Sequence, residues 1–183
     1  MRVLVTGING FVGRHLLHEL ESHDVDVWGL DTESSSDKTV AADILNQEML
    51  KNNINEITPD FVIHLAAISS VDHKDLSAMY RVNFNGTLNL LSACIALDKM
   101  PKFLFVSSSQ VYGNVAADKL PIDESFPLEP VNHYGASKAA AEMTVKAFGA
   151  EYGLPYVIVR PFNHTGPGQS DRFVVPKIVN AFR

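Results

Sequence analysis

Three glycines mark the turn Gly7-Ile8-Asn9-Gly10-Phe11-Val12-Gly13, which lies between an apolar run at Arg2–Thr6 and a helical pattern at Phe11–Ser22. In a strand–turn–helix unit, the first glycine permits the tight turn, the second lets a phosphate approach the backbone, and the third allows close packing. The helix start adds amide groups and a partial positive charge. The spacing is G-x-x-G-x-x-G, and a glycine-bearing turn without a ligand is the alternative. We predict a dinucleotide-diphosphate site formed by Gly7, Gly10, Phe11, Val12 and Gly13.

Short β-branched runs alternate with longer helical patterns along the whole chain. The runs lie at Arg2–Thr6, Val25–Leu30, Asp60–Leu65, Lys102–Ser107 and Pro155–Arg160. The helical patterns lie at Phe11–Ser22, Asn46–Glu56, Leu76–Leu97 and Tyr134–Tyr152. Such alternation is typical of a parallel sheet with crossover helices. The predicted fold class is α/β, a Rossmann-like doubly wound parallel sheet of five strands. Residues Thr32–Thr39 are expected to form a solvent-exposed loop.

Composition and charge narrow the function classes. The 183 residues are enough for one full-sized core, and the formal net charge is −6. This charge argues against a nucleic-acid partner or an anionic membrane surface, because both need a basic face. Cys94 is the single cysteine, so no intrachain disulfide and no cysteine-based zinc site is expected, and no metal site is predicted. Because no membrane span or signal peptide is evident, we expect a cytoplasmic protein.

Asp31 ends the second predicted strand, about 20 residues beyond the glycine turn, where an acid can accept hydrogen bonds from an adenosine ribose. A carboxylate there would repel a 2′-phosphate, so the sequence favours NAD over NADP as the cofactor. Lys38, the nearest downstream cation in the same loop, is the residue that could reverse this preference. The alternative role for Asp31 is to cap a turn.

Tyr134 and Lys138 stand four residues apart at the start of a predicted helix, so they share one face. A phenol has a pKa of about 10, and a neighbouring ammonium and an oxidised nicotinamide ring would both lower it, so that Tyr134 could act as a general acid or base. The cluster Ser107-Ser108-Ser109 closes a predicted strand at the end where open α/β sheets bind ligands. One of these hydroxyls could hydrogen-bond a substrate oxygen, and turn formation is the alternative for the others.

The glycine turn, the Ser-Ser-x-x-Val-Tyr-Gly segment at 107–113 and the Tyr-x-x-x-Lys pair together resemble the extended short-chain dehydrogenase/reductase family of nucleotide-sugar epimerases, dehydratases and reductases. The resemblance covers essentially the whole chain. It implies that Ser108, Tyr134 and Lys138 are catalytic. It implies further contacts with NAD from Asp43, Ile44, Leu65, Ala66, Ala67, Asn83, Ser107, Tyr134, Lys138 and Pro161. It implies contacts with a nucleotide-sugar substrate from Ser108, Ser109 and Asn163.

Two segments narrow the activity within this family. The sugar-nucleotide 4,6-dehydratases have an Asp-Glu pair directly after the catalytic hydroxyl, whereas this chain has Ser109 and Gln110 there. The run Arg160–Gln169 closely resembles that of GDP-4-keto-6-deoxy-mannose reductases. We therefore expect a reductase that acts at C4 of a nucleotide-linked 4-keto-6-deoxy sugar. A nucleotide-sugar 4-epimerase and a non-catalytic NAD-binding regulator are the alternatives.

The resemblance also implies a domain division and an oligomeric state. Residues 1–172 correspond to the NAD-binding catalytic domain, and residues 173–183 to the start of a substrate domain that is missing or truncated here. The chain would then be the cofactor half of a longer enzyme. The helical ranges 76–97 and 134–152 are apolar on more than one face, and the family pairs these helices across a two-fold axis. We therefore expect a homodimer through them.

Two further titratable residues, His64 and Glu124, are not assigned a catalytic role. His64 lies in an apolar strand, and we interpret it as a core histidine with satisfied hydrogen bonds. Glu124 lies in the proline-containing excursion at Lys119–Val131. It is expected to be a solvated acid, although it could approach the sugar.

Overall fold

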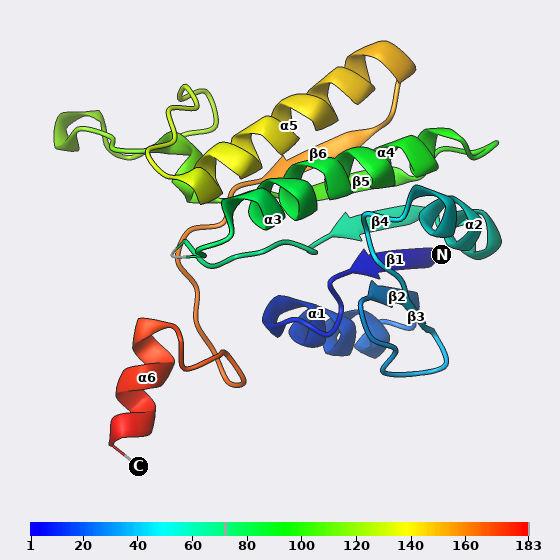
Figure 1. Ribbon diagram of the computed structural model, residues 1–183, viewed down its shortest axis with the longest axis horizontal. Coiled ribbons are helices and arrows are strands. Elements are labelled where there is room, and N and C mark those ends of the chain that lie inside the picture. Colours follow the sequence, from blue (N-terminus) through cyan, green and yellow to red (C-terminus); the bar gives the residue numbers. More distant parts are fainter. Residues whose placement is uncertain (72, 183) are drawn as a thin grey trace.

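The computed structural model describes residues 1–71 and 73–182. One parallel sheet with the strand order β3-β2-β1-β4-β5-β6 forms its centre (Figure 1). The strands are β1 (Arg2–Thr6), β2 (Asp26–Asp31), β3 (Thr39–Ala41), β4 (Phe61–His64), β5 (Lys102–Val106) and β6 (Tyr156–Val159). The chain adds β2 and β3 on one side of β1, and β4, β5 and β6 on the other. This winding in two directions confirms the predicted fold class.

The sheet has one strand more than the five predicted. β3 pairs in parallel with β2, where Thr39 and Ala41 match Gly29 and Asp31. Thr39 is buried, whereas residues 32–38 are exposed as expected of a solvent loop. The loop therefore ends one residue earlier than predicted. An edge strand of three residues is too short to show the alternating pattern by which strands are recognised in a sequence.

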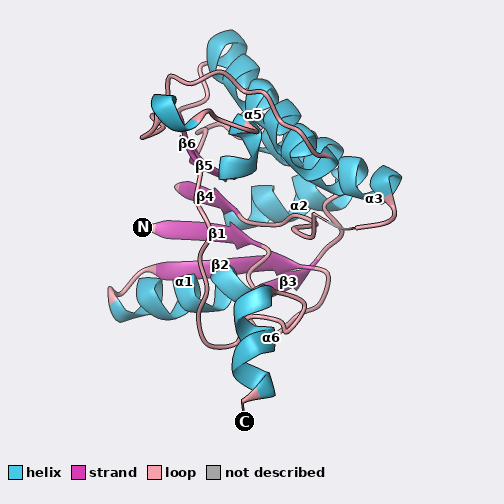
Figure 2. Ribbon diagram, turned by 90° about the vertical axis from the view of Figure 1, so that its left-hand side faces the viewer, coloured by secondary structure: helices cyan, strands magenta, loops and turns pink. Residues whose placement is uncertain are grey.

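Helices cover both faces of the sheet (Figures 1 and 2). α1 (Phe11–Ser22) lies on one face, while α2 (Gln47–Ile57), α4 (Thr87–Ile95) and α5 (His133–Tyr152) form a layer on the other. The two apolar clusters follow from the alternation of side chains along β1. Val3 and Val5 pack with the apolar face of α1, whereas Leu4 joins the larger core beneath the layer of three helices.

The helix predicted over 76–97 is interrupted. It consists of α3 (Leu76–Tyr80), a π-helical turn (Arg81–Gly86) and α4. Within the π-helical turn Asn83 is buried, and its carbonyl accepts a hydrogen bond from the Thr87 hydroxyl at 2.7 Å. Gly86 lets the turn approach α2's side of the core, because a Cβ there would lie 2.8 Å from the Ile44 side chain. Such turns are frequent at functional sites.

The last helix, α6 (Val174–Ala181), stands apart from the sheet near the carboxyl ends of its strands (Figure 1). Its apolar side chains are exposed, and so is the edge strand β6, where Val157 is 57% exposed. Arg183, the last residue of the predicted segment 173–183, lies outside the described residues. Across the part of the chain that is described, no helix is long and apolar enough to span a membrane.

Candidate active site

A cavity of about 1040 Å³ opens at the carboxyl ends of the strands. It lies where the chain reverses its winding direction, which is where open α/β sheets bind ligands. The predicted site residues that line it are Gly7, Gly10, Phe11, Val12, Gly13, Asp31, Asp43, Ile44, Leu65, Ala66, Ala67, Ser107, Ser108, Tyr134, Lys138, Pro161 and Asn163. Two predicted site residues, Asn83 and Ser109, are not among its lining residues.

The glycine turn forms one end of the cavity. Gly7 has a φ of +73°, and a Cβ on it would lie 2.7 Å from the backbone nitrogen of Ala66. A Cβ on Gly13 would collide with the Ile8 carbonyl oxygen. These close approaches bring the start of α1 to the strand ends. No side chain of the described residues caps α1 at Gly10, so its first amides are available to an anionic ligand.

Asp31 is held in place by backbone amides. One carboxylate oxygen accepts the Asn9 N–H at 2.9 Å, and the other accepts the Thr32 N–H at 2.8 Å. The carboxylate therefore keeps a fixed orientation beside the glycine turn. Lys38, the cation that could reverse the NAD preference, instead pairs with Asp26 at 2.7 Å and does not line the cavity.

The three serines after β5 have different surroundings. The Ser107 Oγ is buried and has no hydrogen-bond partner among the described residues, although Ser107 lines the cavity. The Ser108 Oγ accepts the Gln110 N–H at 3.2 Å, which leaves its own proton available for donation. Ser109 uses its backbone, whose N–H donates to the Pro161 carbonyl at 3.0 Å. The hydroxyls of Ser107 and Ser108 can therefore both donate into the cavity.

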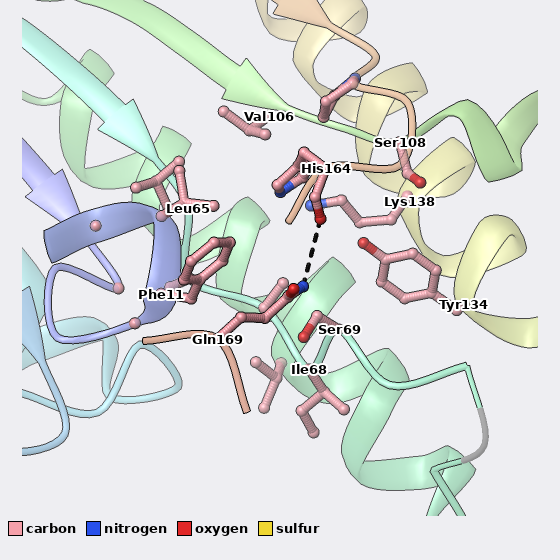
Figure 3. Close-up of a pocket in the computed structure, with 18 of the residues that line it drawn as sticks. Phe11, Leu65, Ile68, Ser69, Val106, Ser108, Tyr134, Lys138, His164 and Gln169 are labelled. Carbon is pink, nitrogen blue, oxygen red and sulfur yellow. Dashed lines mark hydrogen bonds between the residues drawn. The ribbon is translucent and has the colours of Figure 1, made fainter. Parts of the chain in front are cut away.

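Tyr134 and Lys138 lie near Ser108 at the far end of the cavity from the glycine turn (Figure 3). Burial raises the pKa of the Tyr134 phenol, and the nearby Ser108 hydroxyl opposes this shift. Burial also lowers the pKa of Lys138 to about 7. With protein groups alone, the pKa of the phenol is therefore raised, whereas the sequence-based expectation is that the ammonium and an oxidised nicotinamide ring together lower it. Desolvation dominates, and the phenol is a neutral proton donor at neutral pH.

Asn83 is buried and does not line the cavity, but its side chain holds two segments that do. Its side-chain carbonyl accepts the Ile68 N–H at 2.8 Å, and its amide donates to the Ile68 carbonyl at 3.1 Å and to the Ser137 hydroxyl at 3.0 Å. Ser137 in turn donates to the Tyr134 carbonyl at 2.7 Å. Asn83 therefore ties the cavity segment that follows β4 to the first turn of α5.

Sequence reasoning missed several lining residues from the segment that follows β6. Figure 3 shows His164 and Gln169 facing the cavity, and the Gln169 side-chain amide donates to the His164 carbonyl at 3.4 Å. The start of α6, with Phe173, also lines the cavity. The ten-residue resemblance over 160–169 was the available signal. Glu124 is exposed, and its backbone carbonyl, rather than its carboxylate, accepts a hydrogen bond from Arg160.

The described residues fit a dinucleotide. A buried hydroxyl normally has a hydrogen-bond partner, so the unpaired Ser107 Oγ suits a polar ligand in the cavity. The uncapped amides of α1 suit a diphosphate, and the oriented Asp31 carboxylate suits ribose hydroxyls. These groups all belong to one cavity.

Comparison with known proteins agrees with this geometry. Residues 3–183 match a family model described as the NAD dependent epimerase/dehydratase family. The chain is 40% identical over 176 residues to GDP-6-deoxy-D-mannose reductase of Pseudomonas aeruginosa, covering 95% of this chain and 56% of the reductase. The structure of RMD from Pseudomonas aeruginosa complexed with NADPH is similar, with a TM-score of 0.85 and 38% identity, covering 98% of this chain and 59% of RMD.

The UDP-glucose 4-epimerase of Thermus thermophilus, in complex with NAD, has a TM-score of 0.87 and 32% identity, covering 100% of this chain and 61% of the epimerase. The chain thus spans a little over half the length of the curated relatives it matches first. The matched residues include both ends of the cavity. The chain belongs to the NAD dependent epimerase/dehydratase family.

Proposed function

We propose that this chain binds NAD and carries the catalytic residues of a reductase that acts at C4 of a nucleotide-linked 4-keto-6-deoxy sugar. The observation that carries the proposal is the placement of Ser108, Tyr134 and Lys138 around one end of a cavity whose other end is the glycine turn (Figure 3). Acid–base groups and phosphate-binding backbone thus share one cavity. The similarity to GDP-6-deoxy-D-mannose reductase supports the choice of reaction.

Each catalytic side chain has a role that its surroundings support. Ser108 donates its free hydroxyl proton in a hydrogen bond to the sugar carbonyl oxygen. Tyr134 holds its proton at neutral pH because burial raises the pKa of the phenol, and it transfers that proton to the C4 oxygen. Reduced nicotinamide, when bound, supplies the hydride that C4 receives. The Lys138 ammonium stabilises the phenolate that remains after proton transfer.

A 4-epimerase is the second candidate. The same serine, tyrosine and lysine can remove and return hydrogen at C4, and UDP-glucose 4-epimerase shares the fold. A 4,6-dehydratase has less support, because the Gln110 side chain accepts a hydrogen bond from Asn132 at 2.8 Å and no carboxylate follows Ser108. A regulator that binds NAD without turnover is the third candidate, and the intact catalytic residues speak against it.

The proposal includes the domain division and the dimer. Residues 1–172 would form the NAD-binding catalytic domain, and residues 173–183 would begin the substrate domain. The dimer would pair the helical ranges 76–97 and 134–152. Met79 and Leu91 are buried within the chain itself, so the contact would depend on exposed residues such as Met143. A monomer in sedimentation at micromolar concentration would contradict the dimer.

A cytosolic location, where a reduced Cys94 is expected, belongs to the same proposal.

The test is a single-turnover measurement with the chain in excess over a GDP-linked 4-keto-6-deoxy sugar, following NADH absorbance. We expect NADH to bind and to be oxidised slowly, well below the median enzyme rate of roughly 10 s⁻¹, because the chain covers 56% of the related reductase. Tyr134→Phe should bind NADH equally but lose on the order of 10²–10⁴-fold in hydride transfer. Interconversion of UDP-glucose and UDP-galactose in place of this reaction would favour the epimerase. NADH binding with no hydride transfer to any substrate would favour the regulator.

A further inference from the structure

A buried ion pair lies beside the proposed active site, and the mechanism above does not use it. The Glu142 side chain on α5 is fully buried, and the Arg160 side chain just after β6 is 9% exposed. The Arg160 Nε donates to one carboxylate oxygen at 3.0 Å, and its Nη2 donates to the other at 2.9 Å. Removing two charges from water is costly, and apolar residues can often replace such a pair without loss of stability. Stability alone is therefore a weak explanation for its presence.

The Arg160 guanidinium also reaches the turn that carries Ser108. Its Nη1 donates to the Tyr112 hydroxyl at 2.9 Å, and the guanidinium lies 5.0 Å from the centroid of the Tyr112 ring. Tyr112 ends the 3₁₀ turn Ser109–Tyr112, and Ser108 caps that turn. One guanidinium therefore joins the helix of the catalytic tyrosine and lysine to the turn of the catalytic serine.

The same two elements meet again at the start of α5. The Asn132 side chain donates to the Gln110 side-chain carbonyl at 2.8 Å. Gly135 allows α5 to pass closely, because a Cβ there would lie 2.5 Å from the Gln110 carbonyl oxygen. The turn is thus held against α5 at its beginning by Asn132 and at its end by Arg160. These two attachments restrict the orientation of the turn relative to α5.

Glu142 follows Lys138 by one helical turn and acts on its charge. The pKa of Lys138 is lowered by burial to about 7, and the negative charge of Glu142 opposes this shift. The other groups that face Lys138 are Tyr134 from α5, His64 from β4 and the Phe105 ring from β5. His64 is neutral at this pH because burial lowers its pKa to about 3. Glu142 is therefore the anion that supports the ammonium among these groups.

We propose that Glu142 and Arg160 are positioning residues of the active site: Arg160 fixes the Ser108 turn against α5, and the Glu142 carboxylate, one helical turn after Lys138, supports the Lys138 ammonium. The importance of both effects for catalysis rests on the proposed function. Each effect can nevertheless be measured without substrate or turnover. A failure of this inference is therefore distinguishable from a failure of the proposed reaction.

The charge effect is tested by NMR titration of the lysine side chains in the 183-residue chain, with the Lys138 signal identified by its loss in Lys138→Met. Glu142→Gln should lower the Lys138 pKa by about one unit or more. The double variant Glu142→Leu/Arg160→Met removes both charges, and it should keep the fold while the Lys138 pKa stays below the wild-type value. Glu151→Gln, on the exposed end of the same helix, is the control. A folded double variant with the wild-type Lys138 pKa would overturn this half of the inference.

The attachment of the serine turn is tested by amide hydrogen exchange. Tyr112→Phe removes only the hydroxyl that accepts from Arg160, so the fold should survive. We expect the Gln110 amide, which donates to Ser108, to exchange several-fold faster, while amides of α1 keep their rates. Tyr80→Phe is the matched control, because it also removes one tyrosine hydroxyl, which contacts the His133 ring rather than Arg160. Unchanged Gln110 exchange in Tyr112→Phe would overturn the positioning role of Arg160, even if the charge variants failed to fold.

Discussion

The Lys138 Nζ lies 4.5 Å from the centroid of the Phe105 ring, on the buried side of the proposed active site. A cation over an aromatic face is attracted to it. Nevertheless the pKa of Lys138 is lowered to about 7, because the cost of burying the ammonium exceeds the support from Glu142. The buried Lys138 ammonium therefore destabilises the folded chain. Such destabilisation is expected at a site where function requires a charge in a cavity.

Replacing this lysine should stabilise the chain in a pH-dependent way. In the unfolded chain the lysine pKa returns to 10.5, so between pH 7 and 10.5 the unfolded state binds more protons and stability rises with pH. The destabilisation caused by burying the Lys138 ammonium therefore has its full size below pH 7. We expect Lys138→Met to raise the free energy of unfolding by about 4 kcal/mol more at pH 6 than at pH 10.5. Urea unfolding at both pH values measures this difference, and an equal effect at both would contradict it.

Two neighbouring serines should separate cofactor binding from catalysis. Ser107→Ala removes the buried hydroxyl that lacks a partner, so the stability of the ligand-free chain should stay the same or rise. Its affinity for NAD should fall by about five- to tenfold, the equivalent of one lost hydrogen bond. Ser108→Ala should leave NAD affinity within about twofold while slowing hydride transfer. Calorimetric titration of both variants with NAD measures these two affinities. Equal NAD affinity in Ser107→Ala and the wild type would remove Ser107 from the cofactor site.

The parts of the site that could be predicted from the sequence are those whose residues lie close together within one short segment. The glycine turn and the Tyr134–Lys138 pair each lie within one turn and one helix, so their spacing determines what they bring together. The serine cluster could be placed at the ligand-binding edge by the same reasoning. Selecting Ser108 from the three required the family resemblance.

The parts that could not be predicted depend on contacts between distant segments. Glu142 and Arg160 are 18 positions apart, and charged residues of these types are mostly exposed. Nothing local indicates that they are buried together. The π-helical turn around Asn83 likewise depends on its hydrogen bonds to Ile68 and Ser137. The raised pKa of Tyr134 required its burial to be known, because a neighbouring ammonium alone predicts the opposite direction.

Cofactor choice should follow Asp31. Its carboxylate is fixed by the Asn9 and Thr32 amides, and Lys38 is held by Asp26, so no cation offsets its repulsion of a 2′-phosphate among the described residues of this loop. We expect NADH to bind at least about tenfold more tightly than NADPH, which corresponds to about 1.4 kcal/mol. Asp31→Ser should reduce this ratio, and Lys38→Met is the control that should leave it unchanged. Because RMD from Pseudomonas aeruginosa was solved with NADPH, fluorescence titration with both reduced cofactors is decisive, and tighter NADPH binding would refute the assignment.

Acid should destabilise the chain through His64. This histidine is buried as expected, and its ring nitrogens contact the hydroxyls of Thr6 at 2.6 Å and Thr87 at 3.0 Å. Burial lowers its pKa from 6.5 to about 3, so below pH 6.5 only the unfolded chain takes up the proton. The contribution of neutral His64 to the free energy of unfolding is complete above pH 6.5. It is lost as the pH falls towards 3, by about 1.4 kcal/mol per pH unit. His64→Gln retains a polar side chain that can reach both threonines but does not titrate, so stability should fall less steeply between pH 6.5 and 4. The measurement is urea unfolding at half-unit pH intervals, with His18→Gln at an exposed position as the matched control. Parallel curves for His64→Gln and the wild type would show that other groups control the acid response.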